Sequence, residues 1–127
     1  MQCRGIRGAI TVSANSRNSI LAATKRLLSR MVKVNQIEIT NITAILFTTT
    51  PDLDAEFPAA ATRELGWPSN LALLCGHEMN VPGSLARCLR VLLLANTERG
   101  PDEIKHIYLG EARKLKDTPS RVLGGKR

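Results

Sequence analysis

The segment Leu71–Arg90, LALLCGHEMNVPGSLARCLR, decides how the rest of the chain is interpreted. A short apolar run ends at Cys75, and Glu78 follows it almost at once. A turn signalled by Pro82-Gly83 then leads into a second apolar run that contains Arg90. Charged side chains rarely stand inside apolar sequence unless they are paired or bind something polar. The segment therefore predicts two strands that carry polar groups of a pocket for a small anion.

The other strands follow from runs of β-branched and apolar residues. With the two above, the predicted strands are residues 3–12, 42–49, 71–75, 87–97 and 105–109. The run 87–97 has a length at which helix and strand are easily confused. It is assigned as a strand because Gly83 and the segment 97–100 bound it and because it provides partners for the sheet.

One long helix is predicted, from a cap at Asn15 or Ser16 to about Val34, because apolar positions recur there every three or four residues. These positions are Ile20, Thr24, Leu27, Met31 and Val34. A short helix follows Phe57-Pro58 and ends at Gly66, and a helical turn begins at Pro101. The expected fold is a single α/β (α+β) domain with a mixed β-sheet and one long helix.

Composition excludes several classes of protein. A chain of 127 residues with 43% apolar and 23% charged residues fits one globular domain. Its apolar runs are shorter than the roughly 18–20 residues that span a bilayer, and Arg4 and Arg7 stand where a signal peptide would be apolar. Three cysteines without CxxC spacing predict neither a disulfide framework nor a zinc site. We therefore expect a cytoplasmic protein without a metal.

The net charge of +7 is concentrated at one end of the chain. Residues 113–127 hold six basic residues against one acidic residue, a net of +5, which leaves +2 for residues 1–112. Residues 118–127 are predicted to be a flexible basic tail on a domain of residues 1–117. With aromatic residues at 3%, little is available to stack on bases, so nucleic-acid binding is not expected.

Taken singly, the candidate residues have ordinary explanations. An exposed strand charge would account for Arg7, a loop acid for Glu78, and a core aromatic for Tyr108. Cys75 and Cys88 are most simply small buried hydrophobes, and Cys88 keeps that interpretation. A staple for the following helix would account for Phe57.

Other polar positions are given no role. His77 and His106 lack partners at metal-binding or acid–base spacing. The segment Thr48-Thr49-Thr50 is assigned to hydrogen bonding at a strand end, and the basic residues between 25 and 33 are assigned to a solvated helix face.

Five motifs, in this order, closely resemble the AroH-class (Bacillus-type) chorismate mutases. They are RGIRGAITV with Arg7, TPDLDAEFPAAATREL, the segment Cys75–Met79, CLRV with Arg90, and HIYL with Tyr108. The resemblance extends from about Arg4 to Leu115. Any one of these motifs would be weak, but five in register are specific.

This resemblance implies a homotrimer with a pseudo-α/β-barrel arrangement and an active site between adjacent subunits. The implied reaction is the rearrangement of chorismate to prephenate, a step of the shikimate pathway toward phenylalanine and tyrosine. It is a pericyclic isomerisation that needs no metal, no cofactor and no covalent intermediate.

The resemblance also implies roles for the catalytic residues. The ether C–O bond of chorismate breaks ahead of C–C bond formation, so negative charge develops on the ether oxygen. Arg90 would stabilise that charge and reach a substrate carboxylate, and Arg7 would pair with a carboxylate. Glu78 would accept a hydrogen bond from the ring hydroxyl. Cys75 would be a polar contact to that hydroxyl and not a nucleophile.

The remaining substrate-binding positions surround these groups. By the resemblance, Phe57 packs on the ring system, Tyr108 hydrogen-bonds a carboxylate, and Arg63 and Leu115 close the mouth of the pocket. The full set of substrate-binding positions is Phe57, Ala59, Arg63, Leu74, Tyr108 and Leu115.

The chain departs from the family pattern at three positions. Leu74 stands where a small polar residue is expected, Ala60 where a basic residue is common, and Lys116 where an arginine is common. These departures bear on substrate affinity and closure of the pocket, and they leave Arg7, Glu78, Arg90 and Tyr108 intact.

Two other classes of protein remain open. A trimeric carboxylate-binding or imine-hydrolysing protein would also place an arginine on a carboxylate, but it would not need Glu78 or Tyr108. A basic interaction module would bind nucleic acid in a salt-sensitive way that depends on residues 113–127.

Overall fold

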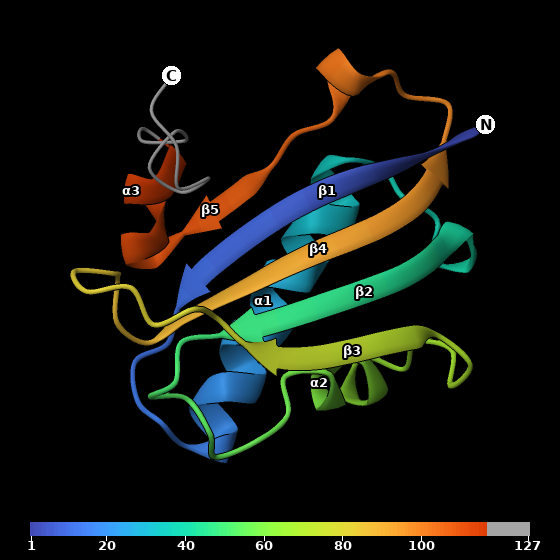
Figure 1. Ribbon diagram of the computed structural model, residues 1–127. Coiled ribbons are helices and arrows are strands. Elements are labelled where there is room, and N and C mark those ends of the chain that lie inside the picture. Colours follow the sequence, from blue (N-terminus) through green and yellow to red (C-terminus); the bar gives the residue numbers. More distant parts are fainter. Residues whose placement is uncertain (117–127) are drawn as a thin grey trace.

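The computed structural model describes residues 1–116, which form one layer of sheet and one layer of helices (Figure 1). The five strands are β1 (Gln2–Thr11), β2 (Ile42–Thr49), β3 (Ala72–His77), β4 (Cys88–Thr97) and β5 (Ile107–Leu109). The helices are α1 (Arg17–Val34), α2 (Ala60–Glu64) and α3 (Arg113–Lys116), with short 3-10 helices η1 (Ile39–Asn41), η2 (Pro101–Glu103) and η3 (Gly110–Ala112). The mixed α+β fold with one long helix is confirmed, while the predicted tail, 118–127, lies outside the described residues.

The sheet has the strand order β3-β2-β4-β1-β5. Strand β4 runs antiparallel to both β1 and β2, whereas the outer pairs β2–β3 and β1–β5 are parallel. As a result, β1, β2, β3 and β5 all end at one end of the sheet, where β4 begins (Figure 1). We call this the polar end of the sheet, because the candidate catalytic side chains gather there.

Helices α1 and α2 cover the same face of the sheet (Figure 1). Figure 1 shows α1 and α2 behind the strands, and the opposite face, which we call the open face, in front of them. Gly8 permits the close approach of α1, because a Cβ atom at that position would lie 2.5 Å from the sulfur of Met31. Ile6 and Ile10 are buried beside it, so side chains that alternate with these, including Arg7, lie on the open face.

The glycine next to Arg7, Gly8, therefore reflects close packing against α1 and not a bulge in the strand. Strand β1 pairs with β4 without interruption from Gln2 to Thr11. The irregularity in the sheet lies instead in β2, between Ile42 and Ala44.

Helix α1 begins as the sequence predicts, with Ser16 as the N-cap accepting a hydrogen bond from the backbone N–H of Ser19. Its buried face is wider than the predicted stripe, because Leu21 and Leu28 are also buried. The β2 strand has the predicted bounds, and α2 follows Phe57-Pro58 as expected.

Strands β3 and β5 each have one end displaced by two residues from the prediction, whereas the ends of β1 and β4 lie within one residue of it. Strand β3 continues past Cys75, because Gly76 and His77 pair with the end of β2. Strand β5 is shorter at its start, because Lys105 pairs with a side chain instead. The buried amide of Asn35 accepts from the Lys105 N–H at 2.8 Å and donates to its carbonyl at 2.9 Å. This contact ties the end of α1 to the segment that enters β5.

Within residues 1–116, no helix combines the length and apolar character that a membrane crossing requires.

Candidate active site

A row of side chains crosses the open face at the polar end of the sheet. Thr48 of β2 lies opposite Arg90 of β4, and Arg90 lies opposite Ala9 of β1. Ala9 in turn pairs with Tyr108 of β5. Because residues at one register position project from the same face, Arg90 and Tyr108 flank the small side chain of Ala9. Ala9 itself is buried against Cys88 and Ala112, so the guanidinium and the phenol lie on either side of a packed position.

Glu78, just past the end of β3, completes this row. Its backbone N–H donates to the Thr49 carbonyl at 2.7 Å, which fixes the chain at the end of the strand. Its carboxylate accepts a hydrogen bond from the Thr48 hydroxyl and lies 3.6 Å from Nε of Arg90. Both charged side chains are about 70% buried, with exposed fractions of 30% for Glu78 and 31% for Arg90. This ion pair is therefore shielded more than an ordinary surface pair.

The Nε atom of Arg90 is buried and has no hydrogen-bond partner among residues 1–116. Buried polar atoms are nearly always hydrogen-bonded, so an unpartnered one calls for an explanation. A ligand with an acceptor oxygen on the open face would provide the missing partner.

Arg7 lies on the same face, one step along β1 from this row. Its side chain is exposed, and it pairs in register with Leu92 of β4, two residues beyond Arg90. Its backbone N–H donates at 2.9 Å to Nδ1 of His106. Burial lowers the pKa of His106, and the charge of Arg7 adds to this effect. The neutral imidazole therefore extends the β1–β5 pairing by one residue, to Arg7.

Tyr108 is half-buried, and Leu115 packs against the same cluster of buried side chains. A small cluster of buried side chains, namely Ala9, Cys88 and Ala112, packs against Leu85, Tyr108 and Leu115. Leu115 of α3 thus lies close to the same end of the sheet as Arg90. Arg7, Glu78, Arg90, Tyr108 and Leu115 form what we call the open-face group.

The other candidates form a second group on the helix side of β3. Cys75 pairs with the buried Phe47, so it faces the helices. Near it a cavity of about 340 Å³ is lined by Thr49, Leu53, Asp54, Ala55, Glu56, Phe57, Pro58, Cys75, Gly76 and His77. Ala59 packs against the core beside Cys75, and Arg63 is exposed on α2. We call Phe57, Ala59, Arg63 and Cys75 the edge group.

A single subunit does not gather the two groups around one ligand. Cys75 and Ala59 of the edge group pack on the helix side of the sheet, whereas Arg90 and Tyr108 of the open-face group lie on the opposite side. Leu74 differs from its neighbour Cys75, because it lies on the open face in register with Leu46 and is 65% exposed.

The cysteines are poorly suited to nucleophilic chemistry. Burial raises the pKa of the Cys75 thiol, and the Ala59 backbone opposes this only in part. Burial likewise raises the pKa of Cys88, against the opposing charge of Arg90. Since the thiolate is the reactive form, both cysteines are held in their unreactive state. Among the described residues, no group of His, Cys, Asp and Glu is arranged to hold a metal ion.

The sequence matches the family of type I chorismate mutases over residues 3–118. The chain belongs to this family. It is therefore a chorismate mutase, an isomerase of aromatic amino acid biosynthesis, and the resemblance seen in its motifs is confirmed.

Individual relatives cover nearly the whole chain. It is 45% identical over 114 residues to the chorismate mutase AroH of Thermus thermophilus, a match that covers 89% of this chain and 93% of that protein. It is 40% identical over 109 residues to the chorismate mutase AroH of Bacillus subtilis (strain 168), covering 86% of each. A solved chorismate mutase from Clostridium thermocellum superposes with a TM-score of 0.86 at 47% identity, covering 88% of this chain and 99% of that one.

In this chorismate mutase, sequence reasoning missed the contacts of three polar residues. Thr48 was assigned to strand-end hydrogen bonding, yet its hydroxyl donates to the Glu78 carboxylate. His106, given no role, accepts from the Arg7 backbone, and His77 lines the cavity beside Cys75. The alternation of β2, set in register with β4, would have placed Thr48 beside Arg90, but the register is not visible in the sequence.

Proposed function

We propose that this chorismate mutase rearranges chorismate to prephenate in sites formed between adjacent subunits of a homotrimer. Arg90 is the principal catalytic residue of this proposal. The observation that carries the assignment is its buried Nε atom, which lacks a hydrogen-bond partner and lies beside Glu78 at the polar end of the sheet.

The chemistry explains why a guanidinium is needed there. Negative charge develops on the ether oxygen as the C–O bond breaks, and a fixed cation at that oxygen stabilises the transition state more than the ground state. The sheet and the Glu78 carboxylate hold Arg90 in place, so little reorganisation is required during the reaction. A planar guanidinium can donate to the ether oxygen and to a carboxylate of the same substrate.

The other open-face residues fit the rest of the substrate. Chorismate is a dianion, and Arg7 on β1 and Tyr108 on β5 offer a second cation and a hydroxyl donor on the side of β4 away from β2. Glu78 accepts a hydrogen bond from the ring hydroxyl while Thr48 holds its carboxylate. Binding in this pocket fixes the flexible ether in the compact conformation that the rearrangement needs.

Two features support a site between subunits. The Cys75 side chain of the edge group lies on the opposite side of the sheet from Arg90, so we assign this group to the neighbouring subunit. In addition, Leu74 and Leu92 expose 65% and 38% of their surface on the open face, on either side of Leu46. An apolar face of this kind is typical of a surface that binds another protein chain.

The proposal includes a reaction without metal or cofactor and a cytoplasmic location, where free cysteines are usual. The alternative, a carboxylate-binding protein on the same fold, would bind chorismate without converting it. No observation of the described residues favours that alternative over the enzyme.

The test is the loss of chorismate absorbance with purified protein, with and without a chelator. We expect conversion to prephenate that the chelator leaves unchanged, and an Arg90→Ala variant that loses most of this activity. Sedimentation equilibrium should give three times the chain mass of 13.9 kDa for both proteins. Binding without turnover by the wild-type trimer would establish the alternative.

A further inference from the structure

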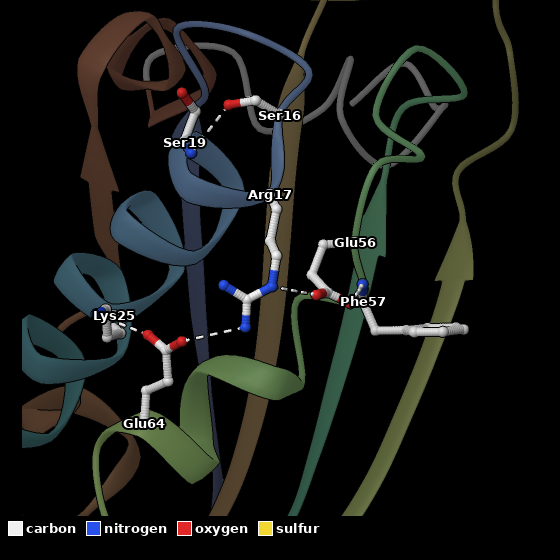
Figure 2. Close-up of polar contacts among 7 residues, drawn as sticks. All are labelled: Ser16, Arg17, Ser19, Lys25, Glu56, Phe57 and Glu64. Atoms are coloured by element: carbon white, nitrogen blue, oxygen red, sulfur yellow. Dashed lines mark hydrogen bonds and ion pairs between the residues drawn. The ribbon is translucent and has the colours of Figure 1, made fainter.

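A chain of charged contacts connects α1 to the wall of the cavity (Figure 2). Nε of Arg17 donates at 2.9 Å to one carboxylate oxygen of Glu56, and the other oxygen of Glu56 accepts from the Phe57 N–H at 2.8 Å. The guanidinium also reaches Glu64 of α2 at 3.4 Å, and Lys25 lies 2.9 Å from the same carboxylate. Glu56 thus bridges Arg17 directly to the backbone of Phe57.

The residues just before Phe57 are held by Asn15, which lies just before the N-cap of α1. Oδ1 of Asn15 accepts from the backbone N–H groups of both Asp54 and Ala55 at 3.0 Å. Its amide nitrogen donates to the Asp54 carboxylate at 2.8 Å. The start of α1 therefore fixes the backbone of residues 54–57, which form one side of the cavity.

The ring of Phe57 has no comparable support from the described part of the chain. Phe57 is 71% exposed, and Figure 2 shows its ring pointing away from the charged network. Packing in the subunit therefore does not set the position of this ring, and the backbone contacts have to do so. The ring lies where the proposed site needs an apolar wall.

We propose that Arg17, acting through Glu56, is a positioning residue that holds Phe57 in place for substrate binding. The inference rests on the proposed place of Phe57 in the substrate pocket. Arg17 does not touch the substrate; it fixes the carboxylate that anchors the Phe57 backbone.

The position of Arg17 in its helix argues against a purely structural role. It is the first residue of α1, and no acidic residue stands in the first turn. A cation at a helix N-terminus is unfavourable, because the helix dipole places partial positive charge there. This cost offsets part of what the two ion pairs of Arg17 contribute, so removing the charge should change the stability of the fold little, and loss of substrate affinity can be separated from loss of fold.

The experiment measures KM and kcat for chorismate in the wild type and in Arg17→Met. We expect KM to rise roughly three- to fivefold, the range of a partly exposed ion pair, with kcat within about twofold of wild type. Arg17→Lys should restore part of the affinity, because it keeps the charge but not the fork that reaches both Glu56 and Glu64. The thermal midpoint of Arg17→Met should stay close to that of the wild type, because the lost ion pairs and the relieved charge at the helix end offset each other.

Two further variants test the route of the effect. Glu56→Ala should raise KM at least as much as Arg17→Met, and the double variant should raise it no further, because both act through one contact chain. Lys25→Met is the matched control, since it removes a charge from the same network without touching Glu56. We expect it to leave KM within about twofold of wild type.

Phe57→Ala separates failure of this inference from failure of the proposed site. If Phe57→Ala raises KM and Arg17→Met does not, the positioning role is wrong and the site stands. If Phe57→Ala leaves KM unchanged, the inference and the place of Phe57 in the pocket are both wrong. Equal losses of stability and activity in Arg17→Met and Lys25→Met would also overturn the inference, because they would indicate a general effect on folding.

Discussion

Glu78 and Arg90 form an ion pair at the polar end of the sheet, with Oε2 of the acid 3.6 Å from Nε of the arginine. Thr48 donates to the same carboxylate oxygen from the neighbouring strand. Because Thr48 and Arg90 are register partners, the sheet itself brings the hydroxyl, the guanidinium and the acid together. The acid is thus oriented before a substrate binds.

Thr48→Val should lower kcat/KM by about tenfold, the usual effect of losing a hydrogen bond to a charged group. Valine has nearly the shape of threonine, so the strand should persist while the Glu78 carboxylate loses its donor. The matched control is Thr43→Val on the same strand, whose hydroxyl donates to the Leu94 carbonyl far from the site. Steady-state kinetics on both variants provide the measurement, and equal effects at the two positions would contradict a special role for Thr48.

Arg90→Lys should lower kcat by about a hundredfold or more, although it preserves the charge. An ammonium cannot donate to the ether oxygen and a carboxylate in the way that a planar guanidinium can. Single-turnover kinetics at saturating chorismate would measure the chemical step directly. Near-normal turnover would show that charge alone is sufficient and that the guanidinium geometry is not used. Arg26→Lys, on the exposed side of α1, is the control for a change of basic residue.

The sequence allowed the elements of the fold to be predicted because its signals are local. The β-branched run of β2, the Ser16 cap and the turn at Pro82-Gly83 each depend on neighbouring residues alone. Contacts between distant segments were not predictable in the same way. Asn35 shortens β5 through hydrogen bonds to Lys105, which lies 70 positions away, and no local sequence pattern predicts that pairing.

For the candidate site too, local motifs were predictable from the sequence and contacts between distant segments were not. The motifs identified Arg7, Glu78, Arg90 and Tyr108, and the structure places all four at one end of one sheet face. Motifs could not reveal that Cys75 faces the other side of the sheet, because that depends on register with β2. The supporting contacts of Thr48 and Arg17 were missed for the same reason, since each links residues at least 30 positions apart.

Cys75→Ser should retain a substantial part of the activity, within about tenfold of wild type, because the proposed role of this residue is only a hydrogen-bonding contact. Burial raises the pKa of its thiol, which keeps it protonated and unreactive at neutral pH. A thiol-alkylating reagent added to the wild type should react slowly at this position. Complete loss of activity in a well-folded Cys75→Ser trimer would indicate a nucleophile and a different reaction.

His106 should make the folded protein sensitive to acid. Its pKa is lowered from the ordinary value of 6.5, chiefly by burial and further by the charge of Arg7. The unfolded chain therefore takes up this proton first as pH falls. The contribution of His106 to stability is fully present above about pH 6.5 and is lost as pH falls through the lower pKa of the folded state. A protonated ring also can no longer accept the Arg7 N–H at Nδ1.

The measurement compares urea unfolding of the wild type and His106→Gln at about pH 7.5 and about pH 5. Glutamine offers a carbonyl oxygen to the Arg7 N–H but takes up no proton, so the variant should lose less stability on acidification than the wild type. Carboxylates that titrate in both proteins cancel in this comparison. Parallel losses in the two proteins would show that the imidazole does not titrate differently on folding, and the role assigned to its contact with Arg7 would then be wrong.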